Sequence, residues 1–102
     1  MAVVSITKDN FNLVTESEKT VLLDFYADWC GPCRMVSPIV DQIAEEYEQY
    51  FVGKVNVDNE PELAEKFGVF SIPTLVIIKN GEIAHQSAGA RPKAQIIALL
   101  EG

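Results

Sequence analysis

The sequence predicts an α/β fold with one mixed, five-stranded sheet and helices on both of its faces. Three observations predict it. Strand-like and helix-like stretches alternate along the chain in the order βαβαβ and then αββα. Residues 21–27 are almost continuously apolar, which is typical of a strand buried on both faces. Asn80 and Gly81 form a strong two-residue hairpin signal, so the last two strands should run antiparallel.

The first half of the chain is expected to form parallel strands joined by right-handed crossovers. Residues 3–6 are a short apolar strand. Thr7 is a candidate cap for the helix that follows, and Phe11 and Val14 should face the core. The buried strand at residues 21–27 comes next.

A long helix is predicted from about Cys33 onward. Pro38 lies inside it, removes one backbone hydrogen bond and should kink it. Its apolar residues recur at helical spacing and should be buried, namely Val36, Ile39, Val40, Ile43, Ala44 and Tyr47.

The third strand is predicted over residues 51–57, where side chains alternate in character. A short helix should follow it. Asn59 is the expected cap of this helix, Pro61 lies in its first turn, and Gly68 stands just past its end.

Two strands and a helix complete the prediction. The strands cover residues 73–78 and 82–88 on either side of the hairpin turn. The last helix covers residues 94–100, and its Ile97 and Leu100 should point inward.

Composition limits the function classes. The chain has 102 residues, 48% of them hydrophobic, which suits a single domain over residues 1–102. Its net charge of −7 and lack of a basic stripe argue against a nucleic-acid partner. No apolar stretch approaches the roughly 20 residues of a membrane span, and the first residues lack signal-peptide features. We therefore expect a cytoplasmic protein, or one from an organelle stroma or matrix if this is a mature form.

The only cysteines, Cys30 and Cys33, lie where the buried strand gives way to the long helix. Side chains at i and i+3 on a helical turn are neighbours, so a small adjustment lets a disulfide form and break there. The ring is so small that it stabilises the fold by only about 2 kcal/mol in the loop-entropy formula. Such a bond favours a chemical role over a structural one.

A helix N-terminus suits a nucleophilic thiol. Unpaired N–H groups and the helix dipole lower the pKa of a thiol there and increase its thiolate fraction. Gly31 offers little shielding, and Pro32 suits a first helical turn. Cys30 comes first and should be the more exposed, so we assign it as the nucleophile and Cys33 as the resolving thiol.

The alternative for the two cysteines is a pair of small buried hydrophobes or half of a zinc site. A structural zinc site takes four ligands, and one chain offers two cysteines and the distant His85. We interpret His85 as a surface strand residue. We therefore expect no metal in a single chain, although two chains together could supply four thiolates.

Asp24 interrupts the buried apolar run. Burial would raise its pKa, because the ionised carboxylate would lose its hydration. A carboxyl in that state can take the proton from Cys33 and later return it. The alternative is an aspartate held by backbone or lysine contacts. Lys54 on the third strand is a candidate neighbour, although its alternating strand fits a solvated lysine equally well.

The string Trp29-Cys30-Gly31-Pro32-Cys33 follows Asp24-Phe25-Tyr26-Ala27 and precedes the distant Ile72-Pro73-Thr74. In these strings the sequence resembles the thioredoxin family, and the resemblance covers essentially the whole chain. It implies the thioredoxin fold. Tyr26 and Arg34 stand where the family more often has tryptophan and lysine, but neither change removes a group that the chemistry needs.

The resemblance also implies site residues and roles. It implies that Asp24 exchanges a proton with Cys33 and that Lys54 lies close to that acid. It implies a cis bond before Pro73, which faces the cysteines and leaves the Ile72 backbone free to pair with an extended substrate peptide. Sequence alone would favour the trans isomer, since only about 5–6% of X-Pro bonds are cis in folded proteins.

Apolar and small residues are expected to form a docking patch around Cys30. Exposed apolar patches mark partner sites. The alternatives are core packing for Trp29 and a plain turn for Gly89. The patch consists of Trp29, Gly31, Pro32, Ile72, Gly89 and Ala90.

We therefore expect a monomeric thiol–disulfide oxidoreductase that reduces target proteins. The chain has no G-x-G-x-x-G nucleotide fingerprint, so its electrons must come from a separate enzyme. The resemblance implies thioredoxin reductase and no cofactor besides the Cys30–Cys33 disulfide. Three alternatives stay open: a thiol oxidase or isomerase, a non-catalytic docking subunit, and a metal-linked dimer.

Overall fold

The computed structural model describes residues 2–102 and contains the predicted mixed sheet. Met1, the first residue of the single domain predicted over residues 1–102, lies outside the described residues. The strand order across the sheet is β1-β3-β2-β4-β5. β3 pairs in parallel with β1 and β2, whereas β4 is antiparallel to both β2 and β5. The strands are β1 (Val4–Ser5), β2 (Thr20–Tyr26), β3 (Tyr50–Asn56), β4 (Thr74–Lys79) and β5 (Glu82–Ala88).

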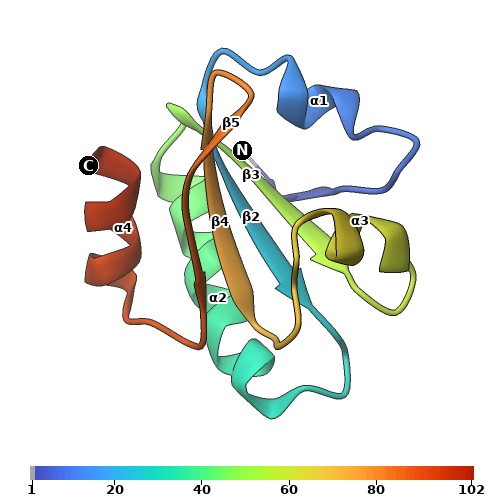
Figure 1. Cartoon of the computed structure of the whole chain (residues 1–102). Helices are drawn as coiled ribbons and strands as arrows, with labels where there is room; N and C mark the ends of the chain where they lie inside the picture. Colours follow the sequence, from blue (N-terminus) through green and yellow to red (C-terminus); the bar gives the residue numbers. More distant parts are fainter. Residues whose placement is uncertain (1) are drawn as a thin grey trace.

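Helices cover both faces of this sheet, as predicted. In Figure 1, α2 and α4 lie on the left of the sheet and α1 and α3 on the right. Across residues 2–102, no helix combines the length and apolar character needed to cross a membrane. The helices are α1 (Asn12–Thr15), α2 (Gly31–Glu46), α3 (Pro61–Lys66) and α4 (Lys93–Glu101).

The central strand β2 divides the core into two layers. Its successive side chains point to opposite faces, so Leu22 packs towards α2 and α4 while Leu23 and Phe25 pack towards α1 and α3. All three are fully buried, which explains the continuous apolar run in the sequence. Asp24 is the one acidic residue in this buried strand, and it shares the α2 face with Leu22.

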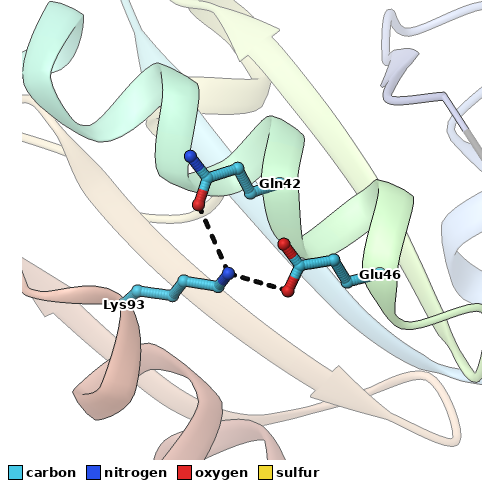
Figure 2. Close-up of polar contacts among 3 residues, drawn as sticks. All are labelled: Gln42, Glu46 and Lys93. Carbon is cyan, nitrogen blue, oxygen red and sulfur yellow. Dashed lines mark hydrogen bonds and ion pairs between the residues drawn. The ribbon is translucent and has the colours of Figure 1, made fainter.

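α2 is a continuous helix that includes Pro38. Its buried residues are Cys33, Val36, Val40, Ile43 and Ala44, while Ile39 and the C-cap residue Tyr47 are only partly buried. Side-chain contacts connect the C-terminal half of α2 to α4 (Figure 2). The Lys93 ammonium lies 2.7 Å from Glu46 Oε1 and 3.3 Å from Gln42 Oε1. Such an exposed ion pair contributes at most about 1 kcal/mol, so it orients α4 more than it stabilises the fold.

Several local predictions were wrong. α1 begins only at Asn12, because Thr7 lies in a preceding turn where its N–H is bound by the Asn10 side chain. Asn59 does not cap α3, whose N-cap position is Glu60 and has no side-chain hydrogen bond. These polar residues hydrogen-bond locally in turns as readily as at helix ends, so their position alone did not fix the helix start.

Two predictions about which side chains point inward also need correction. Ile96 is the fully buried isoleucine of α4, and Ile97 is only partly buried, because Ile96 lies four residues before the buried Leu100 and so shares its face of the helix. His85 is half-buried and not a surface residue. It pairs with Ile77, which faces the α2–α4 core, and within residues 2–102 its buried Nε2 has no hydrogen-bond partner.

Glycines are required at two tight positions. Asn80 and Gly81 both have positive φ, 53° and 79°, as the hairpin turn between β4 and β5 demands. Gly53 lies in β3 between two neighbours, where an added Cβ would lie 2.7 Å from Ile6 Cγ1 and 3.1 Å from Leu23 Cδ2. The close approach of β1 to β3 therefore depends on the absence of a side chain at position 53.

Candidate active site

The cysteines lie at the end of the sheet where β2 leads into α2, β4 begins and β5 ends, at the bottom of Figure 1. A small apolar cluster forms there. It contains Ala27, Cys30 and Cys33, with Ile72 packed against it. Segments that are far apart in the sequence are thus brought to one place by the antiparallel insertion of β4 beside β2.

Cys30 is the N-cap residue of α2, and Cys33 lies one turn inside the helix. The two are joined by a disulfide, with their Cα atoms 5.3 Å apart. The Cys33 N–H donates a hydrogen bond to Cys30 Sγ at 3.2 Å. Because the cap atom is the sulfur itself, a negative charge on Cys30 would be stabilised by the helix N-terminus. Both cysteines are buried, and Cys30 is only slightly the more exposed, at 4% against 2%.

The segment before β4 forms one wall of the site. The Ile72–Pro73 peptide bond, for which the family resemblance implies the cis isomer, is cis. The Ile72 carbonyl oxygen lies 3.8 Å from Cys30 Sγ. The Pro73 carbonyl accepts a hydrogen bond from Gly89 N–H at 2.8 Å, and Gly89 has a φ of +100°. Gly89 therefore holds this wall in place, which is more than a plain turn would do.

Asp24 is completely buried, and neither of its carboxylate oxygens has a hydrogen-bond partner among the described residues. Burial raises the pKa of Asp24 to about 6, since the ionised form would lose its hydration. The positive charge of Lys54 lowers this pKa, and the negative charge of Asp41 raises it further. Its antiparallel neighbour on β4 is the apolar Leu75, which supplies no polar partner.

Lys54 is the neighbour of Asp24 on β3, and their Cα atoms are in register. Its ammonium reaches α2, where it lies 2.9 Å from Asp41 Oδ1 and donates a hydrogen bond to Ser37 Oγ. The lysine is therefore mostly buried and paired, which rules out the solvated alternative. It acts on Asp24 through its charge and not through a hydrogen bond.

Ser37 and Asp41 were missed by the sequence analysis, although a signal was present. Cys33, Ser37 and Asp41 are spaced by four residues, so they share one side of α2. Ser37 also lines a small pocket of about 160 Å³ that reaches Cys33 and continues along the loop after β2. The other lining residues are Tyr26, Ala27, Asp28 and Arg34.

The docking patch lies around the cysteines. Trp29 is 68% exposed, and its Nε1–H donates to Asp58 Oδ2 at 2.9 Å. The alternative interpretation of Trp29 as a core residue is therefore wrong. Gly31, Pro32 and Ala90 are exposed, and Ile72 is half-buried.

Two exposed apolar residues near the patch were also missed. Phe70 is 99% exposed and stands two residues before Ile72. Met35, on the first turns of α2, is exposed and lines a shallow pocket of about 290 Å³ with Ala90, Arg91 and Pro92. An apolar residue in a loop beside Ile72-Pro73 was the available signal for Phe70. Met35 lies in the same pocket as Ala90 of the docking patch and Phe70 lies close to Ile72 in sequence, so both are candidates to extend that patch.

Metal binding finds no support in the part of the chain that the structure describes. Residues 2–102 contain no group of three or more histidine, cysteine, aspartate or glutamate side chains that could hold a metal ion. His85 packs on the α2–α4 face of β5, beside Ile77, away from the Cys30 cluster.

Comparisons with known proteins agree with this geometry. A protein-family model described as Thioredoxin matches residues 2–102. A curated protein named Thioredoxin from Pyropia yezoensis is 48% identical over 102 residues, covering 98% of this chain and 95% of that protein. Those from Chlorobaculum thiosulfatiphilum and Alicyclobacillus acidocaldarius subsp. acidocaldarius, also named Thioredoxin, are 46% and 43% identical. These two alignments cover 93% and 97% of this chain and 90% and 95% of the respective relatives.

Proposed function

This chain belongs to the thioredoxin family, and from that premise we propose that it delivers electrons to disulfide bonds of target proteins in the cytoplasm. It has the thioredoxin fold and is a dithiol–disulfide oxidoreductase. The observation that carries the finer proposal is the position of Cys30 Sγ. This atom caps α2, is bonded to Cys33 and lies beside the Ile72 carbonyl.

The reaction proceeds in two exchanges. The Cys30 thiolate attacks one sulfur of a target disulfide, forms a mixed disulfide with it and expels the other target sulfur as a thiolate. Cys33 then loses its proton and attacks Cys30 Sγ. The second target sulfur leaves, the target gains two electrons and two protons in total, and the Cys30–Cys33 disulfide remains. The hydrogen bond from Cys33 N–H supports Cys30 as the first nucleophile, because it stabilises negative charge on that sulfur.

Asp24 accepts the proton of Cys33 in the second exchange. A general base works best when its pKa lies near the operating pH, and burial raises the pKa of Asp24 to about 6. The absence of a hydrogen-bond partner among the described residues leaves both oxygens of Asp24 free to take a proton. The small pocket beside Cys33 and Ser37 supports the proposal by giving water a place between helix and strand.

Target peptides dock on the patch beside Cys30. An extended peptide pairs with the Ile72 backbone just before β4, in the manner of an added strand. The exposed side chains of Trp29, which directly precedes Cys30, and of Phe70, which lies two residues before Ile72, support this site because they offer large apolar area. Gly89 and the exposed Ala90 complete the proposed docking patch.

Thioredoxin reductase restores the dithiol after each cycle, and the protein works as a monomer without a cofactor besides its disulfide. Thioredoxins are generally reduced in this way, and the sequence carries no nucleotide fingerprint of its own. An organelle stroma or matrix is the alternative compartment. A protein-disulfide oxidase or isomerase is the alternative direction of electron flow.

A trapping experiment tests the order of attack. Cys33→Ser should accumulate a mixed disulfide with a disulfide-containing protein such as insulin, while the matched variant Cys30→Ser should form none. If Cys30→Ser keeps full function, the protein acts as a non-catalytic docking subunit and the proposed chemistry is wrong. The direction is tested by the equilibrium reduction potential against dithiothreitol, followed by Trp29 fluorescence. A value at the reducing end of the dithiol range supports a reductase, and a markedly more oxidising value supports the oxidase or isomerase.

A further inference from the structure

The charge nearest to Asp24 is held by another element of the fold. Asp24 on β2 and Lys54 on β3 are in register, so their side chains leave the sheet on the same face. The ammonium nevertheless finds its partners on α2, at Asp41 Oδ1 and Ser37 Oγ. An ammonium has three N–H donors, and at least two of them are therefore directed towards the helix.

Ser37 is well placed for this contact. It is half-buried and stands one helical turn after Cys33 and one before Asp41. Asp41 is largely exposed, whereas the Lys54 side chain is mostly buried. The ion pair thus draws the ammonium outward to the surface, and the Ser37 hydroxyl adds a hydrogen bond to a charged donor within the interior.

We propose that Ser37 is a positioning residue, whose hydroxyl, together with Asp41, anchors the Lys54 ammonium on α2 and so keeps the Asp24 carboxyl free of a hydrogen-bonded ion pair. Ser37 has no role in binding or exchanging sulfur. It acts through Lys54 on the carboxyl that we propose as the base for Cys33. This inference therefore deepens the proposed function and rests on it for its catalytic consequence, although not for its structural part.

The surroundings of Asp24 leave few other charges to consider. Lys54 faces it from β3 and Asp41 from α2, and these two charges are the ones that shift its pKa besides burial. β4 presents Leu75 opposite it, and the next buried residue on the same face of β2 is Leu22. The cysteines form a disulfide and carry no charge in this state. Control of the carboxyl thus depends on where the single ammonium is held.

The experiment is a pKa titration of Asp24 in the oxidised protein, followed by the ¹³C shift of its carboxyl carbon. In Ser37→Ala the ammonium loses one anchor and turns towards Asp24, so the pKa of Asp24 should fall from about 6 towards its ordinary value of 3.8. Ser37→Thr keeps a hydroxyl at the same position and should restore the original value. Alanine is the best helix former, so the first variant should fold.

A second background separates positioning from general disturbance. In Lys54→Gln the pKa of Asp24 should rise, because the favourable positive charge is gone. Adding Ser37→Ala to Lys54→Gln should then change nothing, since the hydroxyl has no ammonium to hold. A shift of equal size in both backgrounds would overturn the proposal, as would an unchanged pKa in Ser37→Ala alone.

A kinetic readout keeps the proposed function and this inference apart. The release of a target from the Cys30 mixed disulfide should become about two- to fivefold faster at about pH 5 in Ser37→Ala, because more of Asp24 is ionised there. If the pKa of Asp24 falls but the pH dependence of the release rate does not change, the positioning role of Ser37 is supported and the role of Asp24 as base is wrong. If the pKa does not fall, the positioning role itself is wrong.

Discussion

Lys54 is the in-register neighbour of Asp24, yet its ammonium binds Asp41 and Ser37 on α2, and within residues 2–102 neither Asp24 oxygen has a hydrogen-bond partner. The Asp24 carboxyl is completely buried. Its ionisation is therefore opposed by lost hydration and only partly offset by the charge of Lys54. This balance makes ionised Asp24 costly for the fold and suits the carboxyl to its proposed role as a base.

The first prediction concerns stability and pH. Burial raises the pKa of Asp24 from 3.8 to about 6, so the native state binds more protons than the unfolded state between these values. The free energy of unfolding of the parent protein should therefore fall as pH rises from about 4 to about 6 and lose nothing more from this group above that range. Asp24→Asn removes the ionisation and should be more stable by about 1–3 kcal/mol at about pH 7.

Urea unfolding of the oxidised proteins from about pH 3.5 to about pH 8 measures this difference. It should be small at the acidic end and grow through the titration of Asp24. The matched control is Asp9→Asn, which changes an exposed carboxylate in the turn before α1 and should alter stability little. Parallel stability curves for Asp24→Asn and the parent would contradict the prediction.

The second prediction concerns the resolving step. Asp24→Asn should slow release of the target from the Cys30 mixed disulfide by about ten- to a hundredfold near neutral pH, because Cys33 loses its base. The initial attack by Cys30 should keep its rate. Stopped-flow kinetics on a preformed mixed disulfide measures the step alone, and an equal loss in both steps would point to a general disturbance of the site.

The third prediction concerns docking. Phe70 is 99% exposed, so Phe70→Ala should leave the free energy of unfolding unchanged. It should reduce kcat/KM for a folded protein disulfide by about two- to tenfold, mainly through KM, because apolar contact area is lost. The loss should be smaller with a small-molecule disulfide, which cannot reach across the patch. Leu13→Ala, another exposed apolar residue but on α1, is the matched control.

The fourth prediction concerns the sheet. Gly53→Ala should destabilise the protein by about 1–3 kcal/mol, because its Cβ would meet Ile6 Cγ1 at 2.7 Å and Leu23 Cδ2 at 3.1 Å. Gly31→Ala is the matched control, since nothing lies within 4 Å of an added Cβ there. Thermal unfolding of both variants checks the prediction. Equal stability of the two would show that β1 can move away from β3 at little cost.

The architecture could be predicted from sequence because each major element carries its own signal. The apolar run around Phe25 marks a strand buried on both faces, and the two positive-φ residues Asn80 and Gly81 match their turn. The ends of short elements were less predictable. α1 is a single four-residue turn, and Thr7 lies in the turn before it, where its Oγ1 accepts a hydrogen bond from Asp9 N–H that competes with capping.

The cysteine pair and the buried Asp24 could be predicted from the residues themselves, whereas the placement of Lys54 beside Asp24 and of Ile72 beside the cysteines rested largely on the family resemblance. Cys30 and Cys33 identify themselves by spacing and by the strand-to-helix change. The partners of Lys54 could not be identified in this way, since Ser37 and Asp41 contact it only after α2 has packed across the sheet. The exposure of Phe70 could not be predicted either. Phe70 lies in a loop, where no periodic pattern of apolar residues indicates which side chains face the core.

The insertion of β4 beside β2 has a consequence for a chain that is still being synthesised. Cys30 and Cys33 leave the ribosome well before Ile72 and Gly89, which build the wall next to them. A nascent chain therefore carries two thiols without the surface that we propose as the docking site for their targets. Selectivity arrives only when the antiparallel strands have been translated and paired. Until then, the thiols must rely on the reducing environment around the ribosome to avoid unwanted exchange.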